Sequence, residues 1–275
     1  MLRSKISRLV KYIFLVFWLV IAGYPFVFML QSSFKERIEF FTNSVWALPE
    51  NIIFTNYINA LESGFATYFL NSLLICLSSV VLILITGSLA SYAIARLDLK
   101  YNSLFYIVFL AGMMIPVHVT LIPIYKLTIS LGMYDRLYGV VGPYVAFSLP
   151  ITVFILTSFM RDIPHELEEA AIIDGAGKFQ IFTRIIIPVS KPALSTVAIY
   201  NLIILWNEFV YALVILSSPE KWNLTVGLWN FKGQYGNNIP MIMAGLVLSI
   251  LPIIILYVFF QKRVIRGMMA GALKQ

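Results

Sequence analysis

The chain has almost none of the residues from which disulfide frameworks and metal sites are built. It contains one cysteine, Cys76, and two histidines, His118 and His165. A single cysteine cannot form a disulfide within the chain. Residues 165–169, with the sequence HELEE, begin like the helix of a zinc protease, but Glu169 stands where that motif requires its second histidine. We therefore expect no metal site.

A complete phosphate-binding loop is missing too. Residues 175–178, with the sequence GAGK, look like the end of such a loop. The motif, however, requires a glycine where Ile172 stands and a serine or threonine where Phe179 stands. The chain is therefore expected to bind no nucleotide and to be no enzyme. If ATP drives this protein, a separate subunit must bind the ATP and its Mg²⁺.

Charged residues are scarce. They make up 12% of the chain, whereas about 25% is usual in soluble domains. Hydrophobic residues make up 60%, and the mean hydropathy is +0.87. These values predict an all-α polytopic membrane protein. Stretches long enough to cross a bilayer, about 20 residues each, predict six transmembrane helices, at residues 12–30, 69–95, 104–124, 137–160, 193–217 and 240–261.

The basic residues are distributed unevenly between the segments expected on the two sides of the membrane. If the N-terminus is cytoplasmic, most lysines and arginines fall in the inside segments, and the outside loops carry acidic residues that offset their bases. This bias predicts that both termini lie in the cytoplasm. The net charge of +7 is then a consequence of insertion beside anionic lipid, so no nucleic-acid partner is expected. No low-complexity linker or internal repeat is evident, which favours a single transmembrane domain over residues 1–275.

One polar segment, residues 161–192, interrupts the apolar pattern. Pro164 can begin a helix, three glutamates follow in its first turns, where negative charge favours the helix dipole, and Gly175 can break it. Ala170, Ala171 and Asp174 fall on one side at helical spacing. The apolar residues from Phe179 onward predict a second helix packed against the membrane helices. Helix physics alone leaves open an ordinary amphipathic helix at the membrane interface.

The order of residues in this segment resembles the EAA loop of ABC importer permeases. The matching positions are Glu169-Ala170-Ala171, Asp174-Gly175-Ala176 and Ile187-Pro188. Residues 159–192 are similar to the maltose-type, carbohydrate-uptake branch of that family. Further matches include Asn71-Ser72, residues 206–209 (WNEF) and the tail at 267–274, so the resemblance covers nearly everything after residue 45. Asp135-Arg136 departs from it, standing where a small polar pair is usual.

The resemblance implies a type I ABC importer permease fold and a set of partners. A homologous second permease would share the translocation path, two ATPase subunits would dock on the EAA loops, and an extracytoplasmic sugar-binding protein would deliver the substrate. Glu169 would anchor the ATPase, Ala170 and Ala171 would fit its cleft, Gly175 would set the bend and Pro188 would end the second helix. Gly271 and Lys274 in the tail are candidates for a further ATPase contact. Oligosaccharides, disaccharides, polyols and glycerol phosphate are the substrate classes of relatives.

Glu208 is the one acidic residue in the middle of an apolar span. Charge inside a membrane is unfavourable, so Glu208 is a candidate for the translocation path. The structural alternative is a hydrogen-bonded link to a neighbouring helix, assisted by Trp206 and Asn207. The same two interpretations apply to Asn71 and Asn201. Arg96, at a helix end, is predicted to extend its head group to the cytoplasmic interface.

Two other functions compete with the importer. A self-sufficient secondary carrier normally has more helices or an internal inverted repeat, and neither is evident here. A non-transporting membrane scaffold would use the polar segment only to recruit a partner. Only the importer requires an ATPase and a second permease in one complex.

Overall fold

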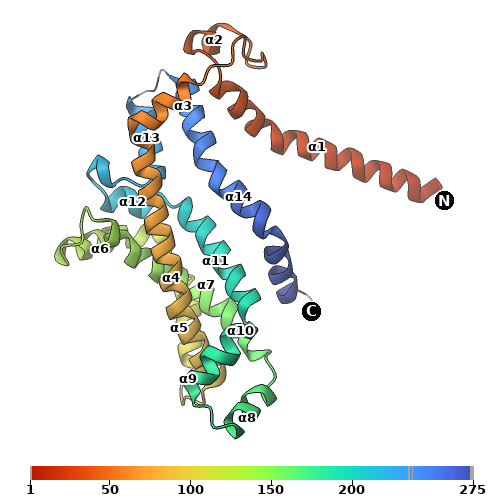
Figure 1. Ribbon diagram of the computed structural model, residues 1–275, viewed down its shortest axis with the longest axis vertical. Coiled ribbons are helices and arrows are strands. Elements are labelled where there is room, and N and C mark those ends of the chain that lie inside the picture. Colours follow the sequence, from red (N-terminus) through yellow and green to blue (C-terminus); the bar gives the residue numbers. More distant parts are fainter. Residues whose placement is uncertain (1, 235, 237, 273–275) are drawn as a thin grey trace. The chain divides into compact units, whose positions relative to one another are not determined.

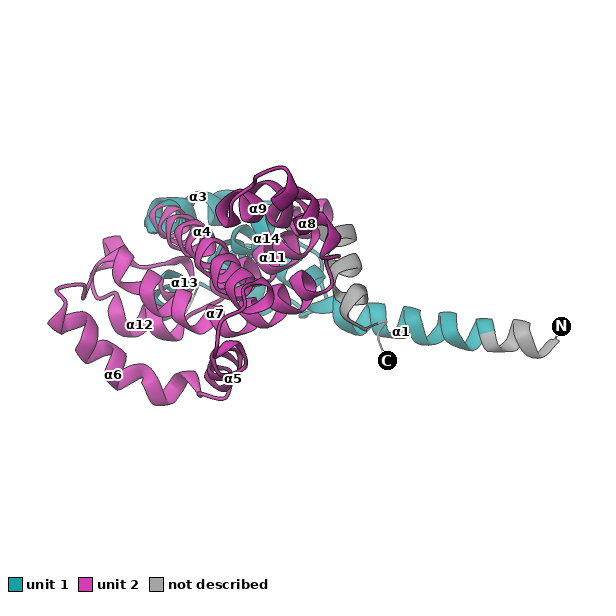
Figure 2. Ribbon diagram, turned by 90° about the horizontal axis from the view of Figure 1, so that it is seen from below, with its two compact units in different colours: residues 1–66, 227–252 teal, residues 67–226, 253–275 magenta. Residues whose placement is uncertain are grey.

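A computed structural model of the chain describes residues 2–234, 236 and 238–272. All regular structure within these residues is helical (Figure 1). The chain divides into two compact units (Figure 2). Unit 1 comprises residues 1–66 and 227–252, and unit 2 comprises residues 67–226 and 253–275.

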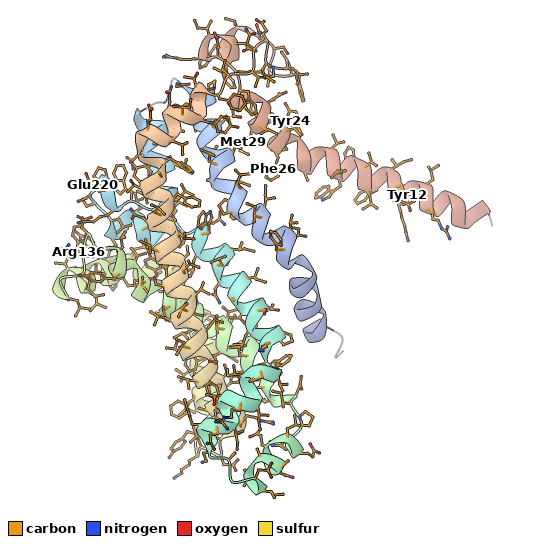
Figure 3. The ribbon with its side chains drawn as sticks, in the orientation of Figure 1. Tyr12, Tyr24, Phe26, Met29, Arg136 and Glu220 are labelled. Carbon is orange, nitrogen blue, oxygen red and sulfur yellow. The ribbon has the colours of Figure 1, made fainter. Side chains whose placement is uncertain are left out.

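Unit 1 begins with a long helix, α1 (Leu2–Ser33), which carries no charged residue between positions 12 and 30. From Leu9 to Val20 every large hydrophobic side chain is exposed, and Tyr12 and Phe26 project from the helix with exposed fractions of 65% and 54% (Figure 3). A helix that is apolar on all sides is suited to a membrane rather than to water. The other helices with residues in this unit are α2 (Arg37–Thr42), α3 (Thr55–Ala60), the π-helical turn η1 (Leu61–Phe65), α13 (Leu224–Gln234) and the start of α14 (Ile239–Ala272).

The end of α1 is fixed to α3 by polar contacts. The amide of Asn56 donates hydrogen bonds to the carbonyl oxygens of Ser33 and Lys35, both at 2.9 Å. The hydroxyls of Ser33 and Tyr57 lie 2.6 Å apart. These bonds satisfy carbonyl groups that the end of a helix leaves without intrahelical partners.

Unit 2 contains most of the membrane helices and the polar segment. Its helix α7 packs against α5, α11 and α12. Two glycines allow close contacts at α7. A Cβ atom added at Gly139, in α7 itself, would lie 2.2 Å from the carbonyl oxygen of Met133. A Cβ atom added at Gly87, in α4, would lie 2.5 Å from Cγ2 of Thr152 in α7. The elements are α4 (Ala66–Arg96), α5 (Asn102–Gly112), α6 (Val117–Ser130), α7 (Leu137–Arg161), α8 (Glu166–Ile173), α9 (Lys178–Ile181), η2 (Phe182–Ile186), α10 (Ile187–Val189), α11 (Lys191–Trp206), α12 (Val210–Ile215) and η3 (Pro219–Lys221).

Among the described residues, four continuous helices are long and apolar enough to cross a membrane, or up to six if each of two bent pairs counts as one span. The four lie in α1, α4, α7 and α14, each of which extends beyond the range predicted from the sequence. One bent pair, α5 with α6, turns by 97° inside the predicted span 104–124. The break falls before Pro116, because proline disfavours helical geometry in the residue that precedes it.

The predicted span 193–217 is also interrupted. It consists of α11 and α12, separated at residues 207–209. At its other end, α11 meets the helix Lys178–Val189 at an angle of 74°, and these two form the second bent pair. The side chain of Glu208, which lies in this break, accepts hydrogen bonds from backbone N–H groups at the start of α12.

Candidate functional site

The polar segment 161–192 folds as a short helix, a bend and a second helix, as the sequence predicts. Helix α8 has three acidic residues in its first turn and ends at Ile173. The N–H of Gly175 bonds to the carbonyl of Ile172 at 3.0 Å, and the N–H of Ala176 bonds to that of Ala171 at 2.8 Å. This pair of bonds is a Schellman motif, which requires a left-handed residue between them. Gly175, with a φ of +83°, supplies it.

One face of this segment is turned outward. Glu169, Ala170, Asp174 and Gly175 are exposed. They are accompanied by Ile172, Ile173 and Phe179, with exposed fractions of 60%, 85% and 72%. We call Glu169, Ala170, Ile172, Ile173 and Phe179 the coupling surface. Apolar side chains gathered on an exposed polar segment are typical of a protein contact.

Two predictions about this face need correction. Ala171 does not share the exposed side with Ala170, because it is partly buried against the core of unit 2. Phe179 was expected to pack with the second helix but is largely exposed. The spacing of residues along a helix does not show whether Ala171 and Phe179 are buried or exposed, since both lie about one turn from the bend at Gly175.

The second helix packs inward, as predicted. Its buried side chains join a cluster with residues from α4, α7 and α11: Tyr92, Leu156, Met160, Ile163, Ile181, Phe182, Ile186, Ala193 and Val197. Pro188 lies one residue before the end of this helix at Val189. Because Pro188 has no N–H to donate to Arg184, the backbone instead forms a π-helical turn closed by the bond from the Ile187 N–H to the Phe182 carbonyl.

Arg96 is not the interfacial anchor that the sequence suggested. Its side chain is 1% exposed and forms an ion pair with Glu168, which is 13% exposed. Its Nη2 donates to the carbonyl oxygen of Ile163 at 2.8 Å, and its Nη1 lies 3.3 Å from Nε2 of His165. The last turn of α4 is therefore bound to the start of the polar segment, a contact between residues about 70 positions apart in the sequence.

Glu208 holds together the broken span and its surroundings. Its carboxylate accepts hydrogen bonds from the Tyr144 hydroxyl at 2.6 Å and from the Tyr211 N–H at 2.9 Å. Its carbonyl oxygen accepts from Asn223 at 3.2 Å and Thr225 at 2.8 Å. These bonds favour the structural alternative for this residue, in which the carboxylate forms a hydrogen-bonded link between the start of α12 and the neighbouring α7.

The other candidates for the translocation path also have defined partners. The amide of Asn71 donates to the carbonyl oxygens of Glu220 and Trp222, both at 2.9 Å. The buried Asn201 donates to the Thr152 hydroxyl at 3.1 Å, while its Oδ1 has no hydrogen-bond partner among the described residues.

The neighbours of Glu208 differ in exposure. Trp206 is buried and meets Phe69 edge-on, with ring centroids 5.5 Å apart. Asn207 is exposed, and its amide donates to the carbonyl of Ile203 at 2.8 Å. A path role for these side chains stays a prediction.

Asp135, which departs from the family pattern, connects two loops of unit 2. It has a φ of 56° and accepts hydrogen bonds from the N–H groups of Ser217 and Ser218 and from Lys221 Nζ, at 2.9, 2.9 and 2.8 Å. Desolvation raises the pKa of the Asp135 carboxyl, but the bonds from Lys221, Ser218 and Ser217 outweigh it and hold that pKa well below its usual range. The carboxylate is therefore ionised at neutral pH.

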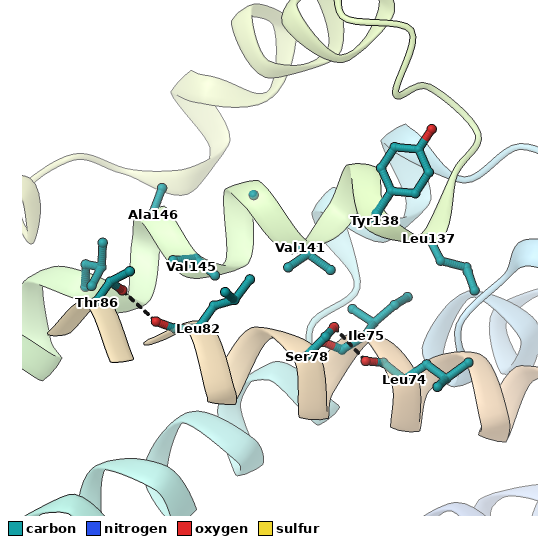
Figure 4. A pocket seen from close by; sticks show the side chains of 12 residues that line it. Leu74, Ile75, Ser78, Leu82, Thr86, Leu137, Tyr138, Val141, Val145 and Ala146 are labelled. Atoms are coloured by element: carbon teal, nitrogen blue, oxygen red, sulfur yellow. Dashed lines mark hydrogen bonds between the residues drawn. The ribbon is translucent and has the colours of Figure 1, made fainter. Parts of the chain in front are cut away.

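An open groove of about 790 Å³ runs between α4 and α7 (Figure 4). The hydroxyls of Ser78 and Thr86 in its wall bond to carbonyl oxygens of their own helix, at 2.7 and 2.6 Å. Apart from the Tyr138 hydroxyl, the lining side chains present apolar surface, so the groove offers few hydrogen-bond partners to a sugar.

The two candidates for an ATPase contact in the tail differ in position. Gly271 lies in the described backbone of α14, and Lys274 lies outside the described residues.

Comparisons with known proteins agree along nearly the whole chain. The family model described as binding-protein-dependent transport system inner membrane component matches residues 83–270. A putative ABC transporter permease protein, ORF2 of Caldicellulosiruptor sp., is 51% identical over 96% of each chain. The diacetylchitobiose uptake system permease protein NgcG of Streptomyces coelicolor is 33% identical over 96% of this chain and 88% of its own.

The fold has a counterpart among solved structures. A chain of a bacterial ABC transporter involved in the import of the acidic polysaccharide alginate matches with a TM-score of 0.71 and 16% identity. The match covers 100% of this chain and 99% of that one.

Proposed function

This chain belongs to the family of binding-protein-dependent transport system inner membrane components, and from that membership we propose that it is one of two permeases in an ATP-driven sugar importer. It is a multi-pass membrane protein with the type I ABC importer permease fold, a transport subunit and not an enzyme. The diacetylchitobiose permease among its relatives supports a carbohydrate, an oligosaccharide or disaccharide or a related polyol or glycerol phosphate, as the substrate.

The observation that carries this proposal is the two-sided structure of segment 161–192. Its outer face is the coupling surface, and its inner face packs into the cluster shared by α4, α7 and α11. A partner that holds the outer face therefore moves the ends of three membrane helices together. Closure of two ATPase subunits on ATP would rock these helices and open the path alternately to each side.

Individual residues of the coupling surface have distinct tasks in this proposal. Glu169 is exposed and offers its carboxylate to a cation on the ATPase, where a charge-assisted hydrogen bond is strong. Ala170 allows the partner backbone to approach closely. Ile173, 85% exposed, would enter an apolar pocket of the partner. Gly175 sets the direction of the chain beyond α8.

The partners follow from the same family membership. We propose a second homologous permease, two ATPase subunits that bind Mg-ATP, and an extracytoplasmic sugar-binding protein. A secondary carrier would need none of these partners, and the coupling surface would then have no function. A scaffold would need one partner but no second permease.

Co-purification tests the proposal. The tagged chain, purified in mild detergent from membranes of its own cell, is expected to bring down a second permease and an ATPase in a ratio of one to one to two. The isolated chain is expected neither to bind nor to hydrolyse ATP, because its phosphate-loop match lacks the first glycine and the hydroxyl residue. A chain that supports uptake while purifying alone would contradict the proposal, as would stoichiometric ATP binding by the isolated chain.

We also propose that both termini and segment 161–192 face the cytoplasm of a bacterial or archaeal cell. Cysteine replacements at two exposed residues test this orientation. In intact cells, Glu62→Cys is expected to react with a membrane-impermeant thiol reagent, and Lys178→Cys is not. The buried native Cys76 should stay silent in both variants. Labelling of Lys178→Cys from outside would reverse the orientation and remove the docking site from the ATPases.

A further inference from the structure

Helix α4 does not adjoin segment 161–192 in the sequence, yet its last two turns contact that segment on both sides of the bend at Gly175. The segment is joined to α7, which ends at Arg161, and to α11, which begins at Lys191. Arg96 binds residues 163–168 at the start of the segment. One turn earlier, the hydroxyl of Tyr92 donates to the carbonyl of Lys178 at 3.3 Å, at the start of the second helix.

We propose that Arg96 is a positioning residue for energy coupling: through Glu168 it fixes the direction of α8 on α4, so that α4 receives the movement of the ATPases directly. This inference rests on the proposed function, because it takes the outer face of α8 as the ATPase contact. Tyr92 supports the same connection at the far side of the bend.

The Arg96 guanidinium is shielded from solvent and Glu168 is partly buried, which makes the pair sensitive to change. The Arg96 side chain is 1% exposed. Its guanidinium forms an ion pair with Glu168, donates a hydrogen bond to the Ile163 carbonyl and lies within hydrogen-bond distance of His165. A buried ion pair adds little net stability, but removal of one partner leaves an unpaired buried charge. The guanidinium is a rigid planar fork, so it defines an orientation that the flexible ammonium of lysine cannot reproduce.

Two adjacent glutamates on α8 thereby take different partners. Glu168 points to Arg96 inside the protein, whereas Glu169 is exposed on the coupling surface. Neighbouring residues on a helix are turned by about 100° from each other, so one turn of α8 can contact both the ATPase and α4. A force on Glu169 therefore reaches α4 through Glu168 without passing through α7 or α11.

The test compares Glu168→Gln with Asp98→Asn, a matched loss of a carboxylate at an exposed residue just beyond the end of α4. The complete complex of each variant is reconstituted in vesicles, and sugar uptake and ATP hydrolysis are measured together. Glu168→Gln is expected to keep its ATPase subunits but to move about tenfold less sugar per ATP, within the range that single positions in a coupling network produce. Arg96→Lys is expected to show the same loss, and Asp98→Asn to match the wild type.

Sugar moved per ATP separates positioning from simple stabilisation, because a variant that only folds less well gives fewer complexes with a normal ratio. The proposal is overturned if Glu168→Gln and Arg96→Lys keep the wild-type ratio, or if both lose their ATPase subunits outright. The double exchange Arg96→Glu with Glu168→Arg should regain part of the ratio if the pair itself matters. Failure of the proposed function looks different, because the wild-type chain would then retain no ATPase at all.

Discussion

Replacement of Glu169 by lysine is expected to abolish sugar uptake while the chain still inserts into the membrane. Glu169 is exposed on α8 and makes no ion pair within the described residues, so its reversal should leave the fold intact. Reversal of a charge contact with the partner can weaken binding by several kcal/mol, and about 1.4 kcal/mol is a tenfold change in affinity. Docking of the ATPase should therefore fall by orders of magnitude.

The control for this change is Asp98→Lys, an exposed acidic residue in the loop between α4 and α5, outside segment 161–192. Uptake and the amount of ATPase retained on membranes are measured for both variants. We expect Glu169→Lys to lose both and Asp98→Lys to lose little of either. Normal uptake with normal ATPase retention in Glu169→Lys would show that segment 161–192 is only an interfacial helix in this protein.

Removal of the Glu208 carboxylate is expected to destabilise unit 2 strongly. In Glu208→Ala, the hydroxyl of Tyr144 and the N–H of Tyr211 lose their acceptor, and both residues are 2% exposed. Each buried polar group left without a partner costs about 1–3 kcal/mol. We expect a clearly lower melting temperature in detergent and much less protein in the membrane.

The neighbouring Asn207→Ala serves as the control, because Asn207 is exposed and bonds only within its own helix among the contacts described. It should melt close to the wild type. If Glu208→Ala also melts like the wild type but loses transport, the carboxylate acts in the translocation path and the structural interpretation is wrong.

Features that depend on neighbouring residues in the sequence were predictable. The apolar runs identify the four continuous spans, since spans of about 20 residues need no long-range information, but not the breaks inside 104–124 and 193–217. The helix, bend and second helix of segment 161–192 follow from acidic residues in a first turn and from Gly175. The EAA-like order of residues gave the family, which the comparisons confirm.

Features that depend on distant partners were not predictable. Arg96 at a helix end is compatible with a lipid interface or with a buried pair, and only the fold brings Glu168 to it. Two adjacent glutamates look equivalent in sequence, although one faces inward and the other outward. The break before α12 lies within an apolar run, and only the structure shows the Glu208 carboxylate bound to N–H groups there. Asp135 connects two loops of unit 2 through partners that lie far from it in the sequence, Ser217 and Lys221.

The central claim is that the outer face of α8 binds the ATPase. It is tested most directly by a photoreactive residue placed at Ile173, 85% exposed, in the assembled and transporting complex. The control position is Met114, 83% exposed at the break between α5 and α6. We predict that position 173 cross-links to the ATPase subunit, that position 114 does not, and that Glu169→Lys removes the cross-link. A complex that transports sugar with no cross-link from position 173, or with one from position 114 instead, would contradict the account.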